Sequence, residues 1–446
     1  MPEARTRIRP ALTLVLALGL SACSQEAQWD ALSQKGRALY DQGKYAEAAK
    51  TTEEALRAAE QLYGLDHVNV ATISHDLAEI YRAQGKYPEA EALYKQALLI
   101  DTKVLGAEHR DTAVVQTNLA ELYRGQGRFT DAEPLYKEAL TVIEKAVGPN
   151  SPEAATVMHD LAMVYHVQGD YPQAESLCQR ALQIFERTFG PRHPHVAQAL
   201  HGLSGVRYAQ GRYAEAEALL NRALNIFERP FGSNPVEAAK ARRDLALMYQ
   251  AQGRFVEAEA EYKRALTALE KALGPEHLDV AVCLHDLANL YTTAQGRYAE
   301  AEPLFQRVRV MYEHLFGPNN MYTAQSMNDL AAVYSAQGRY AEAEPLNAQA
   351  LLIYETMLGP DHPRATTVRA NLAGLYGALG RCGDAEPLYQ QVLGIWERTE
   401  TLSPNHSDTM AMLEGYAVCL RELGKATEAE TIEAKLQRIR GTSVLE

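Results

Sequence analysis

The feature that most constrains this sequence is a repeat of 42 residues that runs through nearly the whole chain. A glycine, usually preceded by Gln and followed by a basic and then an aromatic residue, recurs at Gly43, Gly85, Gly127, Gly169, Gly211, Gly253, Gly296, Gly338, Gly380 and Gly424. The step is 42 residues, except 43 before Gly296 and 44 before Gly424. A fixed period in this range is typical of a solenoid, in which each unit packs on its neighbours.

Each unit has the pattern of two amphipathic helices joined by a turn. The residues that share helical faces in one unit are Leu77, Ala78 and Tyr81 in a first helix and Ala90, Tyr94, Ala97 and Leu98 in a second. Gly85 lies between them as a turn, and Gly106 fits the position after a helix end. A single helix pair cannot bury its apolar face alone, so the pattern predicts an all-α stack of successive pairs.

These residues match the spacing of the tetratricopeptide repeat (TPR), whose usual period is 34 residues. The eight extra residues and the sequence pattern "GPDHP…NLAGLY…EAEPLY" resemble the kinesin light chain type of this repeat. The resemblance implies a right-handed α-solenoid of about ten helix-turn-helix repeats over residues 29–440, followed by a tail at 441–446.

The N-terminal segment is typical of a secretory signal. Three arginines precede an apolar run from Ala11 to Leu20, which is too short to span a bilayer. Leu20-Ser21-Ala22-Cys23 resembles the lipobox of bacterial lipoproteins, which implies a signal peptide at 1–22, a lipid on Cys23 and a short linker at 23–28. The alternative is an ordinary signal peptide with a chance cysteine.

Ser24 follows the cysteine, where enteric-type bacteria place an aspartate to keep a lipoprotein in the inner membrane. The absence of an aspartate at this position resembles lipoproteins that are sorted to the outer membrane. We therefore expect a lipid-anchored protein of the bacterial envelope that faces the periplasm.

The net charge of −13 argues against nucleic acid as a partner, because binding to phosphates needs basic patches. Much of the acidity is explained by i,i+4 pairs on exposed helix faces: Glu91–Lys95, Glu133–Lys137 and Glu259–Lys263.

No arrangement of residues predicts catalysis, a cofactor or a metal site. His75, His159, His201 and His285 share one repeat position, too far apart for one metal, and we interpret them as polar groove residues. His193 and His195 could chelate, but they lie in a loop between repeats. The cysteines after Cys23 fall in different repeats, and an oxidising compartment would permit a Cys382–Cys419 bridge.

The candidate binding residues precede the core leucine of each first helix. In kinesin light chains this position is an Asn that hydrogen-bonds a bound peptide. Two copies match the family and five carry Asp instead: Asn118 and Asn371, against Asp76, Asp160, Asp244, Asp286 and Asp329. Because a carboxylate accepts but cannot donate, a row of Asp favours N–H and cationic groups. The alternative is that each Asp caps or pairs locally.

These features predict a non-catalytic scaffold that binds partner proteins or peptides, including basic segments, in the concave TPR groove. Two more specific hypotheses remain open: a pilotin-like assembly factor for an envelope machine, and a contact activator of a cell-wall enzyme.

The fifth unit departs from its own pattern. Gly202 and Gly205 lie inside its first helix, and Arg207 replaces a Tyr, so we expect a hinge near residues 200–210 and a notch in the groove. The alternative is neutral drift. We expect the head of Arg207 to turn to solvent or to an acidic neighbour, and a bulge or longer turn at Thr292-Thr293.

Overall fold

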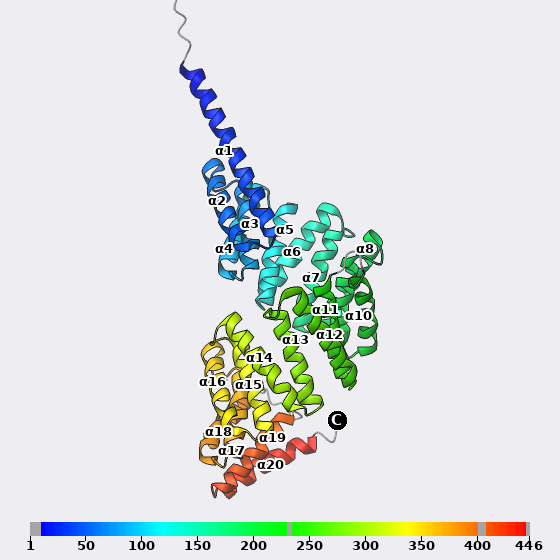
Figure 1. The fold of residues 1–446 in the computed structure, drawn as a ribbon, viewed down its shortest axis with the longest axis vertical. Coiled ribbons are helices and arrows are strands. Elements are labelled where there is room, and N and C mark those ends of the chain that lie inside the picture. Colours follow the sequence, from blue (N-terminus) through cyan, green and yellow to red (C-terminus); the bar gives the residue numbers. More distant parts are fainter. Residues whose placement is uncertain (1–9, 230–233, 400–406, 443–446) are drawn as a thin grey trace, which may run out of the picture. The chain divides into compact units, whose positions relative to one another are not determined.

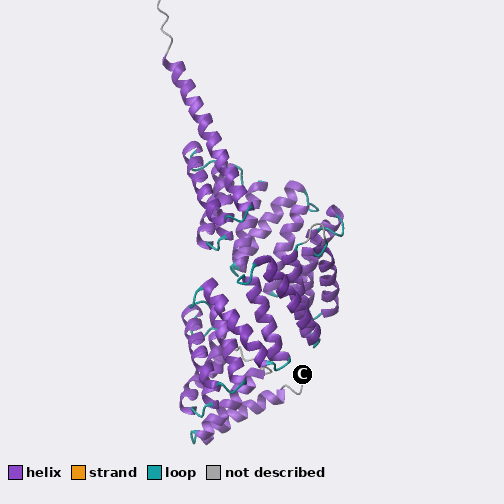
Figure 2. Cartoon of the chain, viewed as in Figure 1, coloured by secondary structure: helices purple, strands orange, loops and turns teal. Residues whose placement is uncertain are grey.

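The computed structural model describes residues 10–229, 234–399 and 407–442, with side chains in the first helix described from Glu26 onward. These residues form twenty α-helices and one short π-helical turn, joined by tight loops (Figures 1 and 2). No strand occurs in the described part of the chain. The fold class predicted from the repeat is confirmed: tandem helix pairs in a solenoid-like stack. The chain divides into two compact units, Met1–Ile226 and Phe227–Glu446.

The helices of the first unit form five pairs. The first helices of these pairs are α1 (Pro10–Asp41), α3 (Val68–Ala83), α5 (Arg110–Gly125), α7 (Pro152–Gln168) and α9 (Pro194–Ala209). The second helices are α2 (Tyr45–Tyr63), α4 (Tyr87–Val104), α6 (Phe129–Val147), α8 (Tyr171–Phe189) and α10 (Tyr213–Phe227). Cys23 lies within α1, and its side chain is outside the described residues. Lipidation and the predicted signal peptide therefore stay predictions.

The second unit also contains five pairs. Its first helices are α11 (Pro235–Ala251), α13 (Leu278–Asn289), α15 (Met321–Ala336), α17 (Pro363–Ala378) and α19 (Ser407–Glu422). Its second helices are α12 (Phe255–Leu273), α14 (Tyr298–Phe316), α16 (Tyr340–Leu358), α18 (Cys382–Thr399) and α20 (Ala426–Thr442).

Small and aromatic residues at fixed repeat positions build the core. Ala90 and Ala97 are fully buried on α4, where they let the next helix approach closely, and Tyr94 fills the space between them. Within each unit, several successive first helices contact one another directly, for example α7 with α9 and α17 with α19. The first helices therefore form the inner face of each stack, which is the side where a solenoid carries its groove.

Most first helices begin with a side chain that caps the helix. Ser151 caps α7, and its Oγ accepts from the Ala154 N–H at 3.2 Å. In five other repeats the cap is a histidine whose Nδ1 accepts a backbone N–H two residues later; these are His67, His109, His193, His277 and His362. This use of histidine was not predicted from the sequence, although these histidines recur at the same position of their repeats.

The extra residue of the seventh repeat is accommodated as predicted, by a local bulge. Residues Leu290–Ala294 form a π-helical turn, η1, at the end of α13. The Arg297 N–H reaches back to the Tyr291 carbonyl at 2.7 Å, whereas the equivalent bond one repeat earlier spans one residue fewer, from Arg254 to Tyr249. The hydroxyls of Thr292 and Thr293 both donate to the Asn289 carbonyl at the start of this turn.

The expected notch at Gly202 is wrong. A Cβ built on Gly202 would lie 2.5 Å from His159 Cε1, so the imidazole of the preceding first helix already fills that space. Arg207 is buried, and its guanidinium lies 2.5 Å from Glu175, which confirms the acidic neighbour rather than the solvent. Residues 194–209 form one continuous helix, and the hinge stays a prediction.

Two further findings concern the cysteines and the membrane. Cys382 and Cys419 form a disulfide between α18 and α19, while Cys178 and Cys283 are buried thiols. Among the described residues, no helix has the length and apolar character needed to cross a bilayer.

Candidate functional site

The candidate site is the line of polar residues that precede the core leucines of the first helices. We call these seven residues the polar row: Asp76, Asn118, Asp160, Asp244, Asp286, Asp329 and Asn371. Each lies one residue before a buried leucine, for example Leu77 or Leu287, and is itself exposed or partly exposed. The repeat register therefore places them all on the first-helix side of their unit, as the sequence predicts.

In the first unit, members of the row contact side chains of the preceding repeat. Arg37 Nε donates to Asp76 Oδ2 at 2.7 Å, and the two groups form an ion pair. One repeat later, Asn118 Nδ2 lies 2.6 Å from His75 Nε2. His75, the residue beside Asp76, thus links its own repeat to the next one.

The same linkage continues in the second unit. His285 Nε2 lies 2.8 Å from Asp329 Oδ2, and Asn371 Nδ2 donates to Asn328 Oδ1 at 2.9 Å. Arg243 pairs with its neighbour Asp244 at 3.0 Å and approaches Asp286 of the next repeat at 3.7 Å. His75, His285 and Arg243 are therefore partners of the row, which was not predicted from the sequence.

The surroundings shift the pKa values of one member of the row, Asp160, and of two histidines at the neighbouring position, His159 and His285. Burial lowers the pKa of His285, but hydrogen bonding to Asp286 and Asp329 outweighs it and raises the pKa to about 9. Burial raises the pKa of Asp160 to about 7, with Arg124 opposing the change. Burial likewise lowers the pKa of His159 to about 4, and its Nδ1 has no hydrogen-bond partner.

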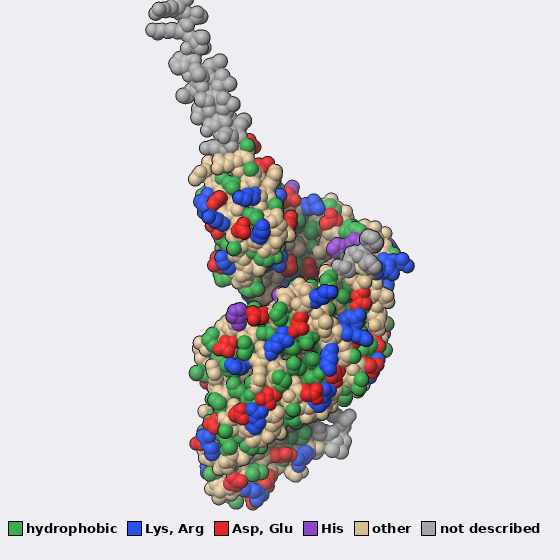
Figure 3. All heavy atoms as spheres, in the orientation of Figure 1, with side chains coloured by type: hydrophobic (Ala, Val, Ile, Leu, Met, Phe, Trp, Pro, Cys, Tyr) green, Lys and Arg blue, Asp and Glu red, His purple; other side chains and the backbone are tan. Residues whose placement is uncertain are grey.

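The row is consequently not a uniform anionic strip. Asp76, Asp286 and Asp329 each lie beside a cation, so local pairing, the alternative considered for the row, describes their state in the free chain. Acidic and basic side chains are also interspersed over the face shown in Figure 3. Such a surface can exchange its internal hydrogen bonds for those of a polypeptide backbone, which carries both donors and acceptors.

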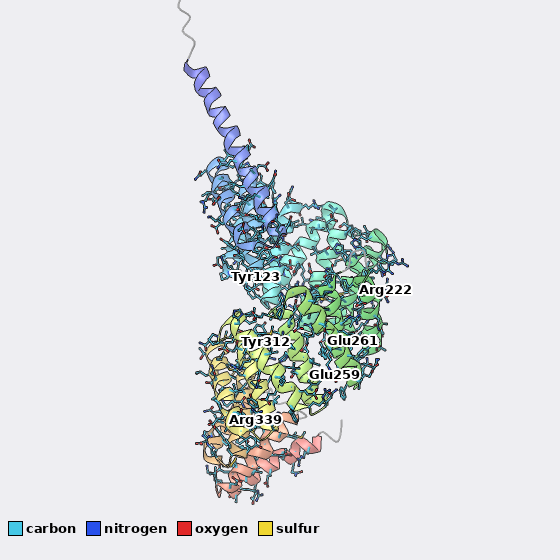
Figure 4. All side chains as sticks on the ribbon, in the orientation of Figure 1. Tyr123, Arg222, Glu259, Glu261, Tyr312 and Arg339 are labelled. Carbon is cyan, nitrogen blue, oxygen red and sulfur yellow. A yellow bond between two sulfur atoms is a disulfide. The ribbon has the colours of Figure 1, made fainter. Side chains whose placement is uncertain are left out.

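A second recurring contact lies between the turn of one repeat and the second helix of the repeat before it. Arg128 stacks on Tyr123 at 4.0 Å from the ring centroid and donates to Glu91 at 2.7 Å. The equivalent residues of two later repeats are Tyr291, Arg297 and Glu259, and Tyr334, Arg339 and Glu302 (Tyr123, Glu259 and Arg339 are labelled in Figure 4). The aromatic and basic residues of the repeat motif thus join neighbouring repeats.

The predicted i,i+4 pairs are present, and their glutamates take part in the same contacts. Lys95, Lys137 and Lys263 lie 2.5–2.6 Å from their partners. Glu91 and Glu259 accept from these lysines and also from the arginine and tyrosine of the following repeat. The acidic excess of the chain is therefore partly structural.

His193 caps helix α9, and His195 lies in the first turn of that helix. The Nδ1 atom of His193 accepts the His195 N–H at 3.3 Å, the His193 ring stacks on Phe189, and the His195 ring stacks on Phe185. Within the described ranges, no three His, Cys, Asp or Glu side chains come together in a way that could hold a metal ion.

The repeat register, the inner face of first helices and the recurring turn glycines define a class of helical-repeat proteins. The family model for the tetratricopeptide repeat matches residues 30–103, 73–145, 111–167, 153–229, 237–313, 292–356 and 322–398. The chain belongs to the tetratricopeptide repeat family. No curated protein matches the sequence.

Three solved structures illustrate the likeness. The apo quorum sensor NprR from B. thuringiensis is 13% identical, with a TM-score of 0.56 over 83% of this chain and 99% of that one. A Rap protein in complex with the competence and sporulation factor is 15% identical, with a TM-score of 0.52 over 93% of this chain and 99% of that one. The TPR-like repeats of a kinesin light chain type from Podospora anserina are 26% identical, with a TM-score of 0.40 over 47% of this chain and 98% of that one.

Proposed function

We propose that the chain is a protein-interaction scaffold that binds a segment of a partner polypeptide along its first-helix face. The observation that carries this proposal is the polar row, which repeats in register and offers partly exposed carboxylates and carboxamides, such as those of Asp286 and Asn371, on that face of each unit. An extended peptide presents alternating N–H and C=O groups that such a row can bind. The Rap protein was solved in complex with the competence and sporulation factor, which supports partner binding by a protein of this fold.

The charge of the row favours a partner with basic groups. Asp244 has 30% of its side chain exposed and Asp286 20%, so both carboxylates are accessible from the groove. A lysine or arginine of the partner would compete with Arg243 for them. This competition costs part of an existing ion pair, so we expect moderate affinity that falls with added salt.

We further propose that the scaffold is tethered by lipid at Cys23 to the outer membrane and faces the periplasm. The lipobox-like sequence supports the anchor, because thioether and amide-linked acyl chains together give stable membrane attachment. The disulfide between Cys382 and Cys419 supports an oxidising compartment, since such bonds are rare in reducing ones.

The binding face can be tested by crosslinking in the cell. A photo-crosslinking amino acid replaces Asp244 or Asp286 in the full-length chain, and attached proteins are identified by mass spectrometry. The matched controls are Leu99 and Val310, exposed residues on the second helices α4 and α14. The proposal predicts one recurrent partner from Asp244 and Asp286 and none from the controls.

A partner that crosslinks equally from the control helices, or no partner from either row position, would contradict it. Once the partner is known, Asp286→Asn removes one charge and retains the size of the side chain. We expect it to weaken binding by several-fold at low salt and to leave the affinity at high salt nearly unchanged.

A further inference from the structure

The second unit contains a pocket of about 610 Å³ that is lined by residues of α15, α16, α17, α18 and α19. Its walls include Ala332, Gly374 and Leu375, and Tyr389 and Trp396 also line it. Asn347 and Asn371 contribute carboxamides to the same space. Asn371 is a member of the polar row, so the pocket opens on the proposed binding face.

The pocket exists because two kinds of side chain are reduced in size here. Asn347 takes the place of a buried ring that fills the core in five other repeats, while two further repeats carry Cys178 and Leu220 at this position; the five rings are Tyr94, Tyr136, Tyr262, Phe305 and Tyr389. On the first helices, Ala332 and Gly374 take the position that Glu121 and Leu247 occupy elsewhere. A missing ring on the second helix and missing side chains on the first leave one continuous recess.

The floor of this recess carries a polar group with no partner. Asn347 is only 2% exposed, and its Oδ1 accepts no hydrogen bond. A buried amide oxygen without a donor costs free energy, and the structure places this one where a ligand can reach it. Asn371 uses one N–H for Asn328 and, as a primary amide, retains a second N–H and carbonyl lone pairs.

The charge of the lining restricts the ligand. No Lys, Arg or His is among the described residues that line the pocket, and its one carboxylate, Asp361, is paired with Arg398 at 3.2 Å. An anionic side chain would find no counter-charge, and a buried ammonium would find only neutral acceptors near Asn347. A purely apolar side chain would leave the Asn347 oxygen without a donor. The lining therefore matches a neutral group that both donates and accepts.

We propose that this pocket binds the carboxamide side chain of a glutamine in the partner segment, hydrogen-bonded to Asn347 at the floor and Asn371 at the rim. The proposal rests on peptide binding by the first-helix face and names one residue that the bound segment contains. Two carboxamides satisfy each other's donors and acceptors in pairs, and the methylenes of glutamine fit between the Ala332, Gly374 and Leu375 walls.

The test uses three isosteric probes and the full-length chain with Trp29→Phe, so that Trp396 in the pocket is its one tryptophan. The probes are blocked pentapeptides, acetyl-Ala-Ala-Xaa-Ala-Ala-amide, with Gln, Glu or Met as Xaa. Titration followed by Trp396 emission is expected to show the Gln peptide binding about ten-fold more tightly than either of the others. Equal affinity for Gln and Met, or no binding of Gln at millimolar concentration, overturns the proposal.

Two variants fill the pocket with side chains that other repeats already accommodate. Asn347→Phe introduces the residue found at Phe305, and Gly374→Leu the one found at Leu247. Each variant is expected to weaken binding of the Gln peptide by at least about ten-fold, while the helical circular dichroism signal is retained. The control is Gly383→Ala, on α18 outside the pocket, where an added Cβ meets no atom within 4 Å. Unchanged binding in both filled variants also overturns the proposal.

The outcomes separate this inference from the proposed function. Crosslinks from Asp286 without selectivity for the Gln peptide reject the glutamine pocket and keep the scaffold. Selective binding of the Gln peptide that Asn347→Phe abolishes, without any crosslinked partner, keeps the pocket and rejects the scaffold as proposed.

Discussion

Two glycines of one helix illustrate how the repeat tolerates departures from its own pattern. Gly202 and Gly205 both lie within α9, where an alanine would lower the entropy of the unfolded chain and strengthen the helix. Their surroundings differ, because a Cβ at Gly202 would meet His159 at 2.5 Å, whereas a Cβ at Gly205 would meet nothing closer than 4.0 Å. The two positions therefore make a matched pair.

We predict opposite effects of alanine at these positions. Gly205→Ala should stabilise the protein by about 0.5–1 kcal/mol, the usual gain for a helix interior. Gly202→Ala should destabilise it by about 1–3 kcal/mol through overpacking against the imidazole. Urea unfolding of the two variants measures this, and adding His159→Ala to Gly202→Ala should recover part of the loss. A stabilising Gly202→Ala would contradict the packing described here.

The His285–Asp329 contact makes stability depend on pH. Because the folded pKa of His285 is about 9 and the unfolded pKa about 6.5, the charged form stabilises the fold below pH 6.5. This contribution, on the order of 3 kcal/mol, is lost as the pH rises from about 6.5 through 9. We expect wild type to exceed His285→Gln in free energy of unfolding at pH 6, and the difference to shrink by pH 9.5.

His314→Gln is the control for this titration, since His314 is 74% exposed on the same unit. It should show no comparable change between the two pH values. A His285→Gln effect of constant size from pH 6 to 9.5 would mean that the ion pair with Asp329 adds nothing beyond neutral packing.

At the scale of an element, η1 shows that one inserted residue can be absorbed without loss of the repeat. The π-turn at Leu290–Ala294 holds the extra residue locally, and α14 begins with the same turn geometry as its counterparts. Deletion of Thr293 should restore the shorter Arg-to-Tyr bond seen between Arg254 and Tyr249 and should leave the melting temperature unchanged or higher. Deletion of Ala251 from α11, which has no extra residue, should lower it by several degrees. Equal losses in the two deletions would mean that η1 is not a removable insertion.

At the scale of an element, local features could be predicted from the sequence, whereas contacts between repeats could not. Helix pairs, turn glycines and the bulge at Thr292-Thr293 are local, so the pattern of one repeat suffices to predict them. The contacts of Asn118 with His75 and of Asp329 with His285 join residues 43 and 44 positions apart. Predicting them requires the offset between stacked repeats, which sequence periodicity alone does not supply.

The pocket at Asn347 and the expected notch at Gly202 also differ in how far the sequence could predict them. Asn347 could have been found by aligning the repeats, because it is a polar amide at a position where the neighbouring repeats carry buried aromatic or apolar side chains. The notch at Gly202 was predicted from missing atoms in one helix. It failed because the His159 side chain of the neighbouring repeat, whose rotamer the sequence does not specify, occupies the space.

At the scale of the whole molecule, the proposed groove and the proposed anchor are separate features that can be removed independently. The described helices carry the polar row and the pocket, while membrane attachment in this proposal depends on one thiol, that of Cys23. If the anchor is lipid, removal of that thiol should release the chain from the membrane.

We therefore predict that Cys23→Ser abolishes incorporation of radiolabelled palmitate and moves the protein from the membrane to the soluble or unprocessed fraction. Ser24→Asp is the matched variant: it should retain the label but shift the protein towards the inner membrane on a sucrose gradient, if sorting follows the residue after the lipidated cysteine. Both variants should retain the crosslinks from Asp244 and Asp286 after detergent extraction, because the row lies in helices far along the chain from Cys23. Equal palmitate labelling of wild type and Cys23→Ser would exclude the anchor, and the scaffold would then need another explanation for its signal-like N-terminus.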